Sequence, residues 1–319
     1  MTEPTRPVVI LGDVLGDVTV RLSGPIARGT DTGAQVLRGQ GGSAGNTAAW
    51  LAHLGHPVHL VCGLGTDHEG DLAEQALTQL GVHVHATRHA HLLTGTCVVL
   101  VEPGGERSML PDPGASAELG AGAVPEHLFT AGAHLHVTAY ALFNPGARPA
   151  ALRALELARA AQMTISVDPA SAAPLRGVVE RDGSSVVRSW FSHVDLLLPN
   201  EQEVAVLARL AGQTSDEPAQ QARALLDWAH LVVVTLGRGG ALATRRHDPG
   251  HVLRVPAGPA AAVDTTGAGD AFAAGFLHSW LAATNRHDTG TVIEALRAGC
   301  ELGSVVVTAY GSRPPRPSN

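Results

Sequence analysis

The sequence predicts an α/β fold in which a mainly parallel sheet carries helices on both faces. Short apolar segments with the character of buried strands alternate along the chain with segments of helical periodicity, which is the pattern of βαβ units. Glycine-rich turns lead into two of the helical segments, as expected where a strand passes into a helix beside a ligand. The 319 residues can bury a large core, either as one domain or as two smaller ones.

The individual elements follow from local patterns. Apolar runs predict strands of the main sheet at residues 8–11, 59–62, 135–137, 165–168, 195–198 and 231–235. Helical spacing predicts helices at residues 48–54, 71–80 and 150–160, and again after Asp270. Four further short strands are predicted at residues 18–22, 35–38, 95–101 and 106–110. The last two flank Pro103-Gly104-Gly105, which is typical of a hairpin.

Composition excludes several classes of function. The net charge is −7 and there is no basic run, so we expect no nucleic-acid partner. No apolar stretch reaches the length of a membrane span and no secretory signal is evident, so we expect a cytoplasmic protein without a membrane partner. Cys62, Cys97 and Cys300 lack the paired spacing of a zinc or redox site and are interpreted as small apolar packing residues.

The absence of lysine narrows the chemistry further. All 22 residues in the Lys+Arg count are arginines, so a lysine-dependent phosphate loop and Schiff-base catalysis are both excluded. Any ATP chemistry must therefore use backbone N–H groups, magnesium and arginine. The 17 histidines include no His-Glu-x-x-His pattern, and we interpret them as surface or strand residues.

The most informative stretch is Asp264-Thr265-Thr266-Gly267-Ala268-Gly269-Asp270, which runs into an apolar, helix-like segment. Its glycines let the backbone approach a ligand closely, and the free N–H groups of a helix N-terminus attract an anion. A carboxylate beside bound phosphate would repel it unless it takes a proton from the attacking hydroxyl. Asp270 is therefore a candidate general base, and the alternative is that it only caps the helix.

A second glycine-rich stretch, Gly41-Gly42-Ser43-Ala44-Gly45-Asn46-Thr47-Ala48, also leads into a helix, which Gly55 closes. The two stretches lie more than 200 residues apart. Together they resemble both signatures of the phosphofructokinase-B type carbohydrate kinases, the ribokinase-like family, and the resemblance covers nearly the whole chain.

The resemblance implies a three-layer α/β/α sandwich of the ribokinase type with a mainly parallel central sheet and a small β-sheet lid. Residues 13–40 and 93–112 would form the lid. Residues 1–12, 41–92 and 113–319 would form the core that binds ATP and the substrate. The strands of this lid are few and short, and small exposed sheets tend to need a partner, so we expect a homodimer through the lid.

The same resemblance implies the acceptor site. Asp17 matches the lid aspartate that binds sugar hydroxyls, a task that suits a carboxylate because it accepts two directional hydrogen bonds. A simple turn aspartate remains the alternative for this position. Gly41, Gly42 and Asn46 would complete the contacts with the acceptor, and Arg107 of the lid would add a group able to grip hydroxyls or a carboxylate.

The phosphate-donor side is implied by three further matches. Asn200 and Glu203 fit an Asn-x-x-Glu motif that helps to place Mg²⁺ through water, although a helix start with a capping box would look the same. Thr235, Gly237 and Gly240 fit the ATP loop, for which an ordinary turn is the alternative.

Two further assignments complete the donor side. Cys300 would contact the ATP cofactor. Asp264, with the loop near Val307, Tyr310 and Ser312, falls where ribokinases hold a monovalent cation such as K⁺.

Three positions depart from ribokinase itself. Leu15 stands where asparagine is usual, Ser43 replaces a lysine, and no acid occurs near Ala139 and Tyr140. The catalytic and ATP elements therefore match better than the sugar contacts do. D-Ribose is in doubt as the substrate, but phosphoryl transfer is not.

We therefore predict an ATP-dependent kinase that phosphorylates a primary hydroxyl of a small sugar or sugar acid of the ribose, fructose or 2-keto-3-deoxygluconate class. Asp270 would be the base, and Gly267, Ala268 and Gly269 would donate N–H groups to the transferring phosphate. The alternatives are a nucleoside kinase of the same family and a non-catalytic sugar-binding relative. A Rossmann-type oxidoreductase would need a glycine fingerprint that this chain lacks.

Overall fold

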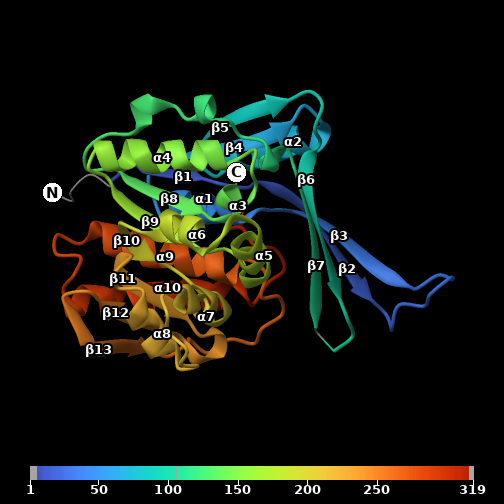
Figure 1. The fold of residues 1–319 in the computed structure, drawn as a ribbon. Helices are drawn as coiled ribbons and strands as arrows, with labels where there is room; N and C mark the ends of the chain where they lie inside the picture. Colours follow the sequence, from blue (N-terminus) through green and yellow to red (C-terminus); the bar gives the residue numbers. More distant parts are fainter. Residues whose placement is uncertain (1–5, 105, 316–319) are drawn as a thin grey trace.

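The computed structural model describes residues 6–104 and 106–315, and within them the chain forms two sheets (Figure 1). The main sheet has the strand order β13-β12-β11-β10-β9-β8-β1-β4-β5. Its strands are β1 (Val8–Leu11), β4 (Val58–Gly65), β5 (Val82–His89), β8 (His134–Thr138), β9 (Thr164–Asp168), β10 (Val194–Leu197), β11 (Ala229–Thr235), β12 (Ala241–Arg245) and β13 (Asp248–Val255).

Every neighbouring pair from β11 to β5 is parallel, and only β12 and β13 at one edge run antiparallel. The prediction of a mainly parallel sheet is confirmed. The central strands are buried on both faces, as β1 shows with four consecutive buried apolar residues. That burial explains why they appear in the sequence as continuous apolar runs.

Helices cover both faces of the main sheet and enclose two separate apolar cores (Figure 1). One core receives side chains from α4 (Arg148–Ala160), α5 (Ala172–Asp182), α6 (Ser184–Phe191), α7 (Glu201–Leu210) and α8 (Pro218–Ala224), with the short α3 (Tyr140–Phe143) beside them. The other receives α1 (Ser43–His53), α2 (His68–Gln79), α9 (Ala268–Ala282) and α10 (Thr289–Val306). The predicted three-layer sandwich is therefore present.

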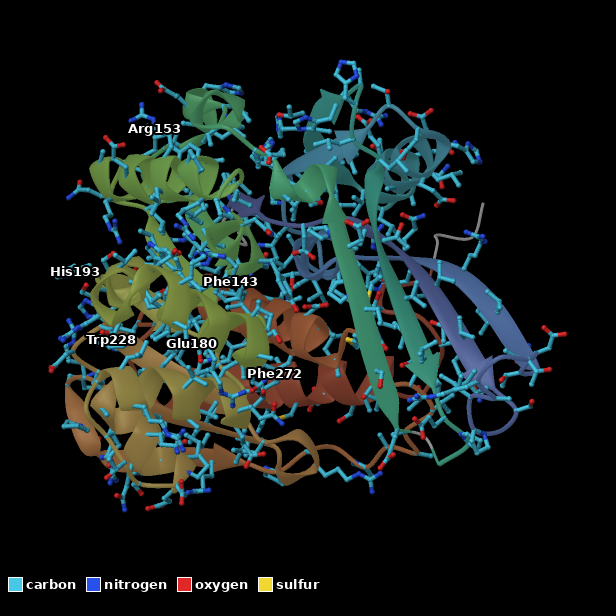
Figure 2. All side chains as sticks on the ribbon, turned by 45° about the vertical axis from the view of Figure 1, so that its right-hand side comes forward. Phe143, Arg153, Glu180, His193, Trp228 and Phe272 are labelled. Carbon is cyan, nitrogen blue, oxygen red and sulfur yellow. The ribbon has the colours of Figure 1, made fainter. Side chains whose placement is uncertain are left out.

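The small sheet extends away from the main body (Figure 1) and has the order β3-β2-β6-β7. It consists of β2 (Leu15–Leu22), β3 (Ala34–Gly41), β6 (Thr94–Val101) and β7 (Arg107–Gly114). The pair β2–β6 is parallel and the other two pairs are antiparallel. The antiparallel pairing of β6 with β7 confirms the predicted hairpin; its turn residue Gly105 lies outside the described residues. Figure 2 shows side chains projecting from both faces of these strands.

Two elements differ from the sequence-based expectation. The helix expected from residue 48 begins at Ser43, so Asn46 lies in its first turn. The edge strand β5 has no apolar run, because His83 and His85 alternate with Val82 and Val84. It pairs with β4 alone, and an edge strand of this kind can carry polar side chains on one face.

No helix in the described part of the chain is long and apolar enough to cross a membrane.

Candidate active site

The predicted site residues gather where parallel strands of the main sheet end, as expected for ligand sites of open α/β sheets. Asp13 follows β1, Asp168 ends β9, Asn200 follows β10 and Thr235 ends β11. The first turns of α1 and α9 and the base of the small sheet approach the same edge, as the contacts below establish.

Asp270 lies in the first turn of α9 and is partly buried. Its Oδ1 accepts a hydrogen bond from Oγ of Ser43 at 2.7 Å, and its Oδ2 accepts one from Nδ2 of Asn46 at 2.8 Å. The turn before it needs Gly267, which has a φ of 76°, and a Cβ there would lie 2.5 Å from Cβ of Ser312. The two glycine-rich motifs therefore form one site.

Burial raises the pKa of Asp270 to about 6, although the hydrogen bonds from Asn46 and Ser43 favour its ionised form. The carboxylate is thus ionised at neutral pH and can still take up a proton. Beside it, a Cβ built on Gly269 meets no atom within 4 Å, so there is open space at the helix N-terminus. This arrangement leaves room for an anion next to a titratable carboxylate.

Asp13 was not singled out from the sequence, yet it shapes the first turn of α1. Its carboxylate accepts hydrogen bonds from the N–H groups of Ser43 at 3.0 Å and Ala44 at 3.5 Å, and from Oγ1 of Thr138 at 3.2 Å. Gly42 has a φ of 86°, and a Cβ there would lie 2.6 Å from the carbonyl oxygen of Asp13. Gly42 therefore serves close backbone packing, and burial raises the pKa of Asp13.

Asp17 lies on β2 against the end of β3. A Cβ on Gly41 would come within 2.3 Å of both carboxylate oxygens of Asp17, so a larger residue there would displace this acid. Burial raises the pKa of Asp17 to about 6, and the positive charge of Arg313 lowers it.

Arg313 is a further residue at this site that the sequence analysis did not select. Its Nη2 donates to the carbonyl oxygen of Gly41 at 2.7 Å and its Nε to Oδ1 of Asn46 at 3.3 Å.

Arg107 of β7 connects the small sheet to the main body. Its Nη1 donates to Oδ1 of Asp264 at 2.8 Å and to Oγ1 of Thr266 at 3.1 Å. The same Asp264 oxygen accepts the N–H of Thr266 at 2.9 Å. The carbonyl oxygen of Val307 accepts hydrogen bonds from the N–H groups of Val263 and Asp264. These oxygens already have donors and an arginine charge, so the arrangement by itself does not call for K⁺ beside Asp264.

Asn200 and Glu203 form a reciprocal capping box at the start of α7. Oδ1 of Asn200 accepts the N–H of Glu203 at 3.0 Å, and Oε2 of Glu203 accepts the N–H of Asn200 at 2.9 Å. Nδ2 of Asn200 also donates to Oε1 of Glu203 at 2.6 Å. The capping box that the sequence allowed at this helix start is therefore present. Each carboxylate oxygen of Glu203 keeps a further lone pair, with which it could accept a hydrogen bond from a metal-bound water.

Asp168 is a second acid at this edge, after Asp13, that the sequence analysis did not select. Its Oδ1 accepts the N–H of Ala170 at 2.7 Å. Burial raises its pKa well above the usual range, and the charge of Glu203 raises it further. Burial likewise raises the pKa of Glu203 to about 7. Asp168, which is half-buried, and the buried Glu203 repel each other, and a nearby divalent cation would relieve that repulsion.

Thr235 lies next to Asn200 in an isolated parallel bridge, and its N–H donates to the carbonyl oxygen of Pro199 at 3.1 Å. A 3₁₀ turn, Gly237–Gly239, follows. Gly240 has a φ of 87°, and a Cβ there would lie 2.0 Å from the carbonyl oxygen of Val255. Nothing lies within 4 Å of a Cβ on Gly237, so the open side of this loop could receive a nucleotide.

Cys300 is a buried residue of α10 within the apolar core, and burial raises the pKa of its thiol to about 11. Its neighbour Gly299 packs closely against the ring of Phe272, which is labelled on α9 in Figure 2. This environment agrees with the packing role inferred for Cys300, and its contact with ATP stays a prediction.

A cavity of about 640 Å³ lies away from these motifs. It is lined by His230, Arg245 and His287, among others, near the start of β11 and the end of β12. Arg245 pairs with Asp248 and bonds the carbonyl oxygen of His287. The cavity therefore lies at the end of β11 opposite Thr235. Among the described residues, no group of three or more His, Cys, Asp or Glu side chains could hold a metal ion.

Comparison with known proteins agrees with this geometry. Residues 6–319 match the model of the pfkB family of carbohydrate kinases. An ATP-dependent ribose-1-phosphate kinase of Halopiger xanaduensis is 30% identical over 312 residues, which cover 96% of this chain and 93% of the relative. A fructokinase of Klebsiella pneumoniae is 31% identical over 305 residues, with 94% of each chain covered.

Solved structures show the same fold. Fructokinase from Vibrio cholerae O395, in a form with fructose, ADP and calcium bound, has a TM-score of 0.80 and 26% identity, with 97% of this chain and 94% of that chain covered. Adenosine kinase from Sinorhizobium meliloti has a TM-score of 0.82 at 24% identity, with 97% and 96% covered, which is evidence of the fold alone. The predicted fold and kinase class are confirmed. This chain belongs to the pfkB family of carbohydrate kinases.

Proposed function

We propose that this protein transfers the γ-phosphoryl group of ATP to a primary hydroxyl of a small sugar or sugar acid of the ribose, fructose or 2-keto-3-deoxygluconate class. The observation that carries the proposal is the position of Asp270. It stands at an open helix N-terminus, and both of its oxygens are oriented by donors from α1. This arrangement suits a base that acts beside a phosphate.

In the proposed reaction, the acceptor hydroxyl gives its proton to Asp270 while its oxygen bonds to the γ-phosphorus. The bond from that phosphorus to the bridging oxygen breaks, and ADP leaves with the electron pair. N–H groups of Gly267, Ala268 and Gly269 at the start of α9 stabilise the charge on the transferring group. Asp270 can accept the proton near neutral pH because burial raises its pKa to about 6.

The acceptor would bind between the small sheet, acting as a lid, and α1. Asp17 and Asn46 offer hydrogen-bonding groups there, and Gly41 and Gly42 keep the space beside them free of side chains. Arg107 joins the lid to Asp264 and Thr266, close to the motif that carries the base. We propose that the lid comprises residues 13–40 and 93–112, and that Arg107 contributes to the acceptor pocket from this position.

ATP would bind along the ends of β10 and β11, near Asn200, Thr235, Gly237 and Gly240, with Cys300 on the adjoining helix. The pair formed by half-buried Asp168 and buried Glu203 fits a divalent ion held through water, and Asn200 and Glu203 would orient its waters. Bound Mg²⁺ would supply charge neutralisation on the phosphates.

A K⁺ ion near Asp264 stays a prediction, tested by replacing K⁺ with choline in the assay. Use of the ATP pool favours a cytoplasmic location.

Two other functions remain alternatives, namely nucleoside phosphorylation and sugar binding without turnover. The open helix N-terminus beside Asp270 favours catalysis, because a binding protein needs no base. The test is ADP release by the purified protein with ATP, Mg²⁺ and single acceptors: ribose, fructose, 2-keto-3-deoxygluconate, ribose 1-phosphate and adenosine. We expect release above the ATP-only background with one of the sugars. No release with any acceptor, together with sugar-dependent thermal stabilisation, would indicate a non-catalytic protein.

A further inference from the structure

The C-terminal segment, residues 311–313, lies between the base of the small sheet, α1 and α9. The carbonyl oxygen of Ser312 accepts a hydrogen bond from Nε1 of Trp50 at 2.9 Å. Arg313 bonds the carbonyl oxygen of Gly41, and a Cβ on Gly45 would lie 2.6 Å from Nη2 of Arg313. Glycine at position 45 thus makes room for the guanidinium, and the segment is tightly packed against the acceptor site.

The contacts of this segment determine how the Asn46 amide is oriented. Its Oδ1 lies 3.0 Å from Oγ of Ser312 and 3.3 Å from Nε of Arg313, and its Nδ2 lies 2.8 Å from Oδ2 of Asp270. A reversed amide would place two donors together at Arg313 and two acceptors together at Asp270. The observed orientation therefore satisfies both ends of the side chain.

Ser312 cannot enforce this orientation alone. Its hydroxyl carries one hydrogen and also lies 3.2 Å from the carbonyl oxygen of Gln40. It could donate there and accept from a reversed Asn46 amide. Arg313 has only donors, so it cannot accommodate the reversal. Asp270 also opposes reversal while ionised, but once protonated it could donate to an oxygen. Arg313 is then the group that still excludes the reversed amide.

We propose that Arg313 is a positioning residue, which holds the Asn46 amide so that Nδ2 faces Asp270 throughout turnover. This inference rests on the proposed function for the role of Asp270 as base. The positive charge of Arg313 also favours the ionised form of Asp270, because it lowers the pKa of Asp270 and of Asp17. Asp13 raises the pKa of Asp270, and its charge also raises the pKa values of Asp168 and Tyr140. Arg313 thus offsets the mutual repulsion of Asp13, Asp17 and Asp270.

The test compares wild type with Arg313→Met and Arg313→Lys. Arg313→Met should move the acidic limb of the kcat/KM profile up by roughly one pH unit, because the carboxylates lose a nearby cation. It should also raise KM for the acceptor more than KM for ATP. Arg313→Lys keeps the charge, so its acidic limb should stay close to that of wild type. If Arg313→Met does not fold, Arg313→Gln replaces it.

A second readout needs no turnover. The ¹³C resonances of aspartate carboxyl groups, with Asp270 assigned through Asp270→Asn, report the titration of Asp270 in the free protein. The pKa of Asp270 should rise in Arg313→Met. Arg148→Met is the matched control, since Arg148 also bonds a backbone carbonyl and lies near an acid, Asp182, away from the site. It should lower the melting temperature and leave the Asp270 titration unchanged.

The outcomes separate the two claims. Wild type without kinase activity would contradict the proposed function, whereas the carboxyl titration would still decide the role of Arg313. A folded Arg313→Met protein with the wild-type titration of Asp270 and, where turnover is measured, the wild-type acidic limb would overturn the inference. Equal shifts in Arg313→Met and Arg148→Met would also overturn it, because they would indicate a general loss of structure.

Discussion

Nδ2 of Asn46 donates a hydrogen bond to Oδ2 of Asp270 at 2.8 Å, across a sequence separation of 224 residues. Ser43, three residues before Asn46, donates to the other oxygen of the same carboxylate. The carboxylate is therefore fixed by the helix that we propose to hold the acceptor. In the proposed reaction the same few contacts would position both the acceptor and the base, so a displacement of α1 would affect both.

Replacing Asp270 with asparagine should leave the binding of ATP and sugar largely intact and reduce turnover by at least ~10²-fold, the scale of losing a general base. The asparagine side chain is close in size to aspartate but cannot accept the proton. Calorimetric titration measures binding, and ADP release measures turnover. Near-normal turnover in the purified variant would remove Asp270 from the mechanism.

Activity should fall as the pH drops through about 6, because Asp270 must be ionised to act and burial raises its pKa to about that value. The check is a profile of kcat/KM from pH 5 to 9 at saturating ATP. A profile that stays flat down to pH 5 would contradict the assignment of the acidic limb to Asp270.

The stability of the folded protein should depend on pH through the ionisation of Asp17. Its folded-state pKa is raised to about 6, so the folded state holds this proton more tightly than the unfolded chain does. Stability is therefore lost as the pH rises from about 4 through 6. Asp17→Asn should melt higher than wild type by roughly 2 °C or more at pH 8, with a smaller gain at pH 5. Asp31→Asn on the exposed loop of the small sheet is the control. Equal gains at both pH values would contradict this account.

Much of this site follows from sequence, and the remainder depends on tertiary contacts. The central strands were predictable because burial on both faces requires apolar runs, and the two motifs were predictable because glycine is needed where backbones meet. Strand β5 was missed because histidines occupy its alternate positions. Asp13 lies in a stretch without a known pattern. Arg313 lies in a proline-rich C-terminal segment, and only the folded chain brings it to Asn46.

If Glu203 holds the waters of Mg²⁺ as we propose, Glu203→Gln should raise the Mg²⁺ concentration for half-maximal rate by roughly 10-fold, because the side chain that accepts from those waters becomes neutral. Glutamine keeps the size of the side chain in its buried position. Titrating Mg²⁺ at constant free ATP measures the effect. Asp288→Asn, which alters the cap of α10, is the matched control and should give the wild-type curve. Identical curves for all three proteins would leave Glu203 with only its capping role.

The small sheet should pair with its counterpart in a second chain. Strand register places Val18, Val20, Val36, Val98, Leu100 and Leu110 on the face opposite that of Asp17. Val36 and Leu110 are 54% and 53% exposed, an apolar surface that a partner would cover. Leu110→Asp should therefore shift sedimentation from dimer to monomer, and Leu152→Asp on α4 should not. Wild type that sediments only as a 32.8 kDa species at micromolar concentration would contradict the dimer.

The last prediction concerns the substrate class. A nucleoside brings a flat base, which proteins commonly hold by stacking on aromatic rings. Residues 14–40 and 93–112 of the predicted lid contain no Phe, Tyr or Trp. An aromatic side chain, Tyr310, does reach the small sheet, but the guanidinium of Arg21 already stacks over its ring at 4.8 Å. Asp17 and Arg107 lie on the same face of this sheet, and both groups suit hydroxyls or a carboxylate.

We therefore expect adenosine to have a specificity constant at least ~10-fold below that of the best sugar or sugar acid, about 1.4 kcal/mol of discrimination. The measurement is a competition assay with adenosine, ribose, fructose, 2-keto-3-deoxygluconate and ribose 1-phosphate at equal concentration, in which consumption of each is followed separately. Arg21→Ala is an informative variant, because it frees the ring of Tyr310 for a base. It should improve adenosine relative to the sugars if stacking is what the wild-type site lacks. If wild type consumes adenosine first, the sugar assignment is wrong, and the absence of lid aromatics does not govern the choice of acceptor.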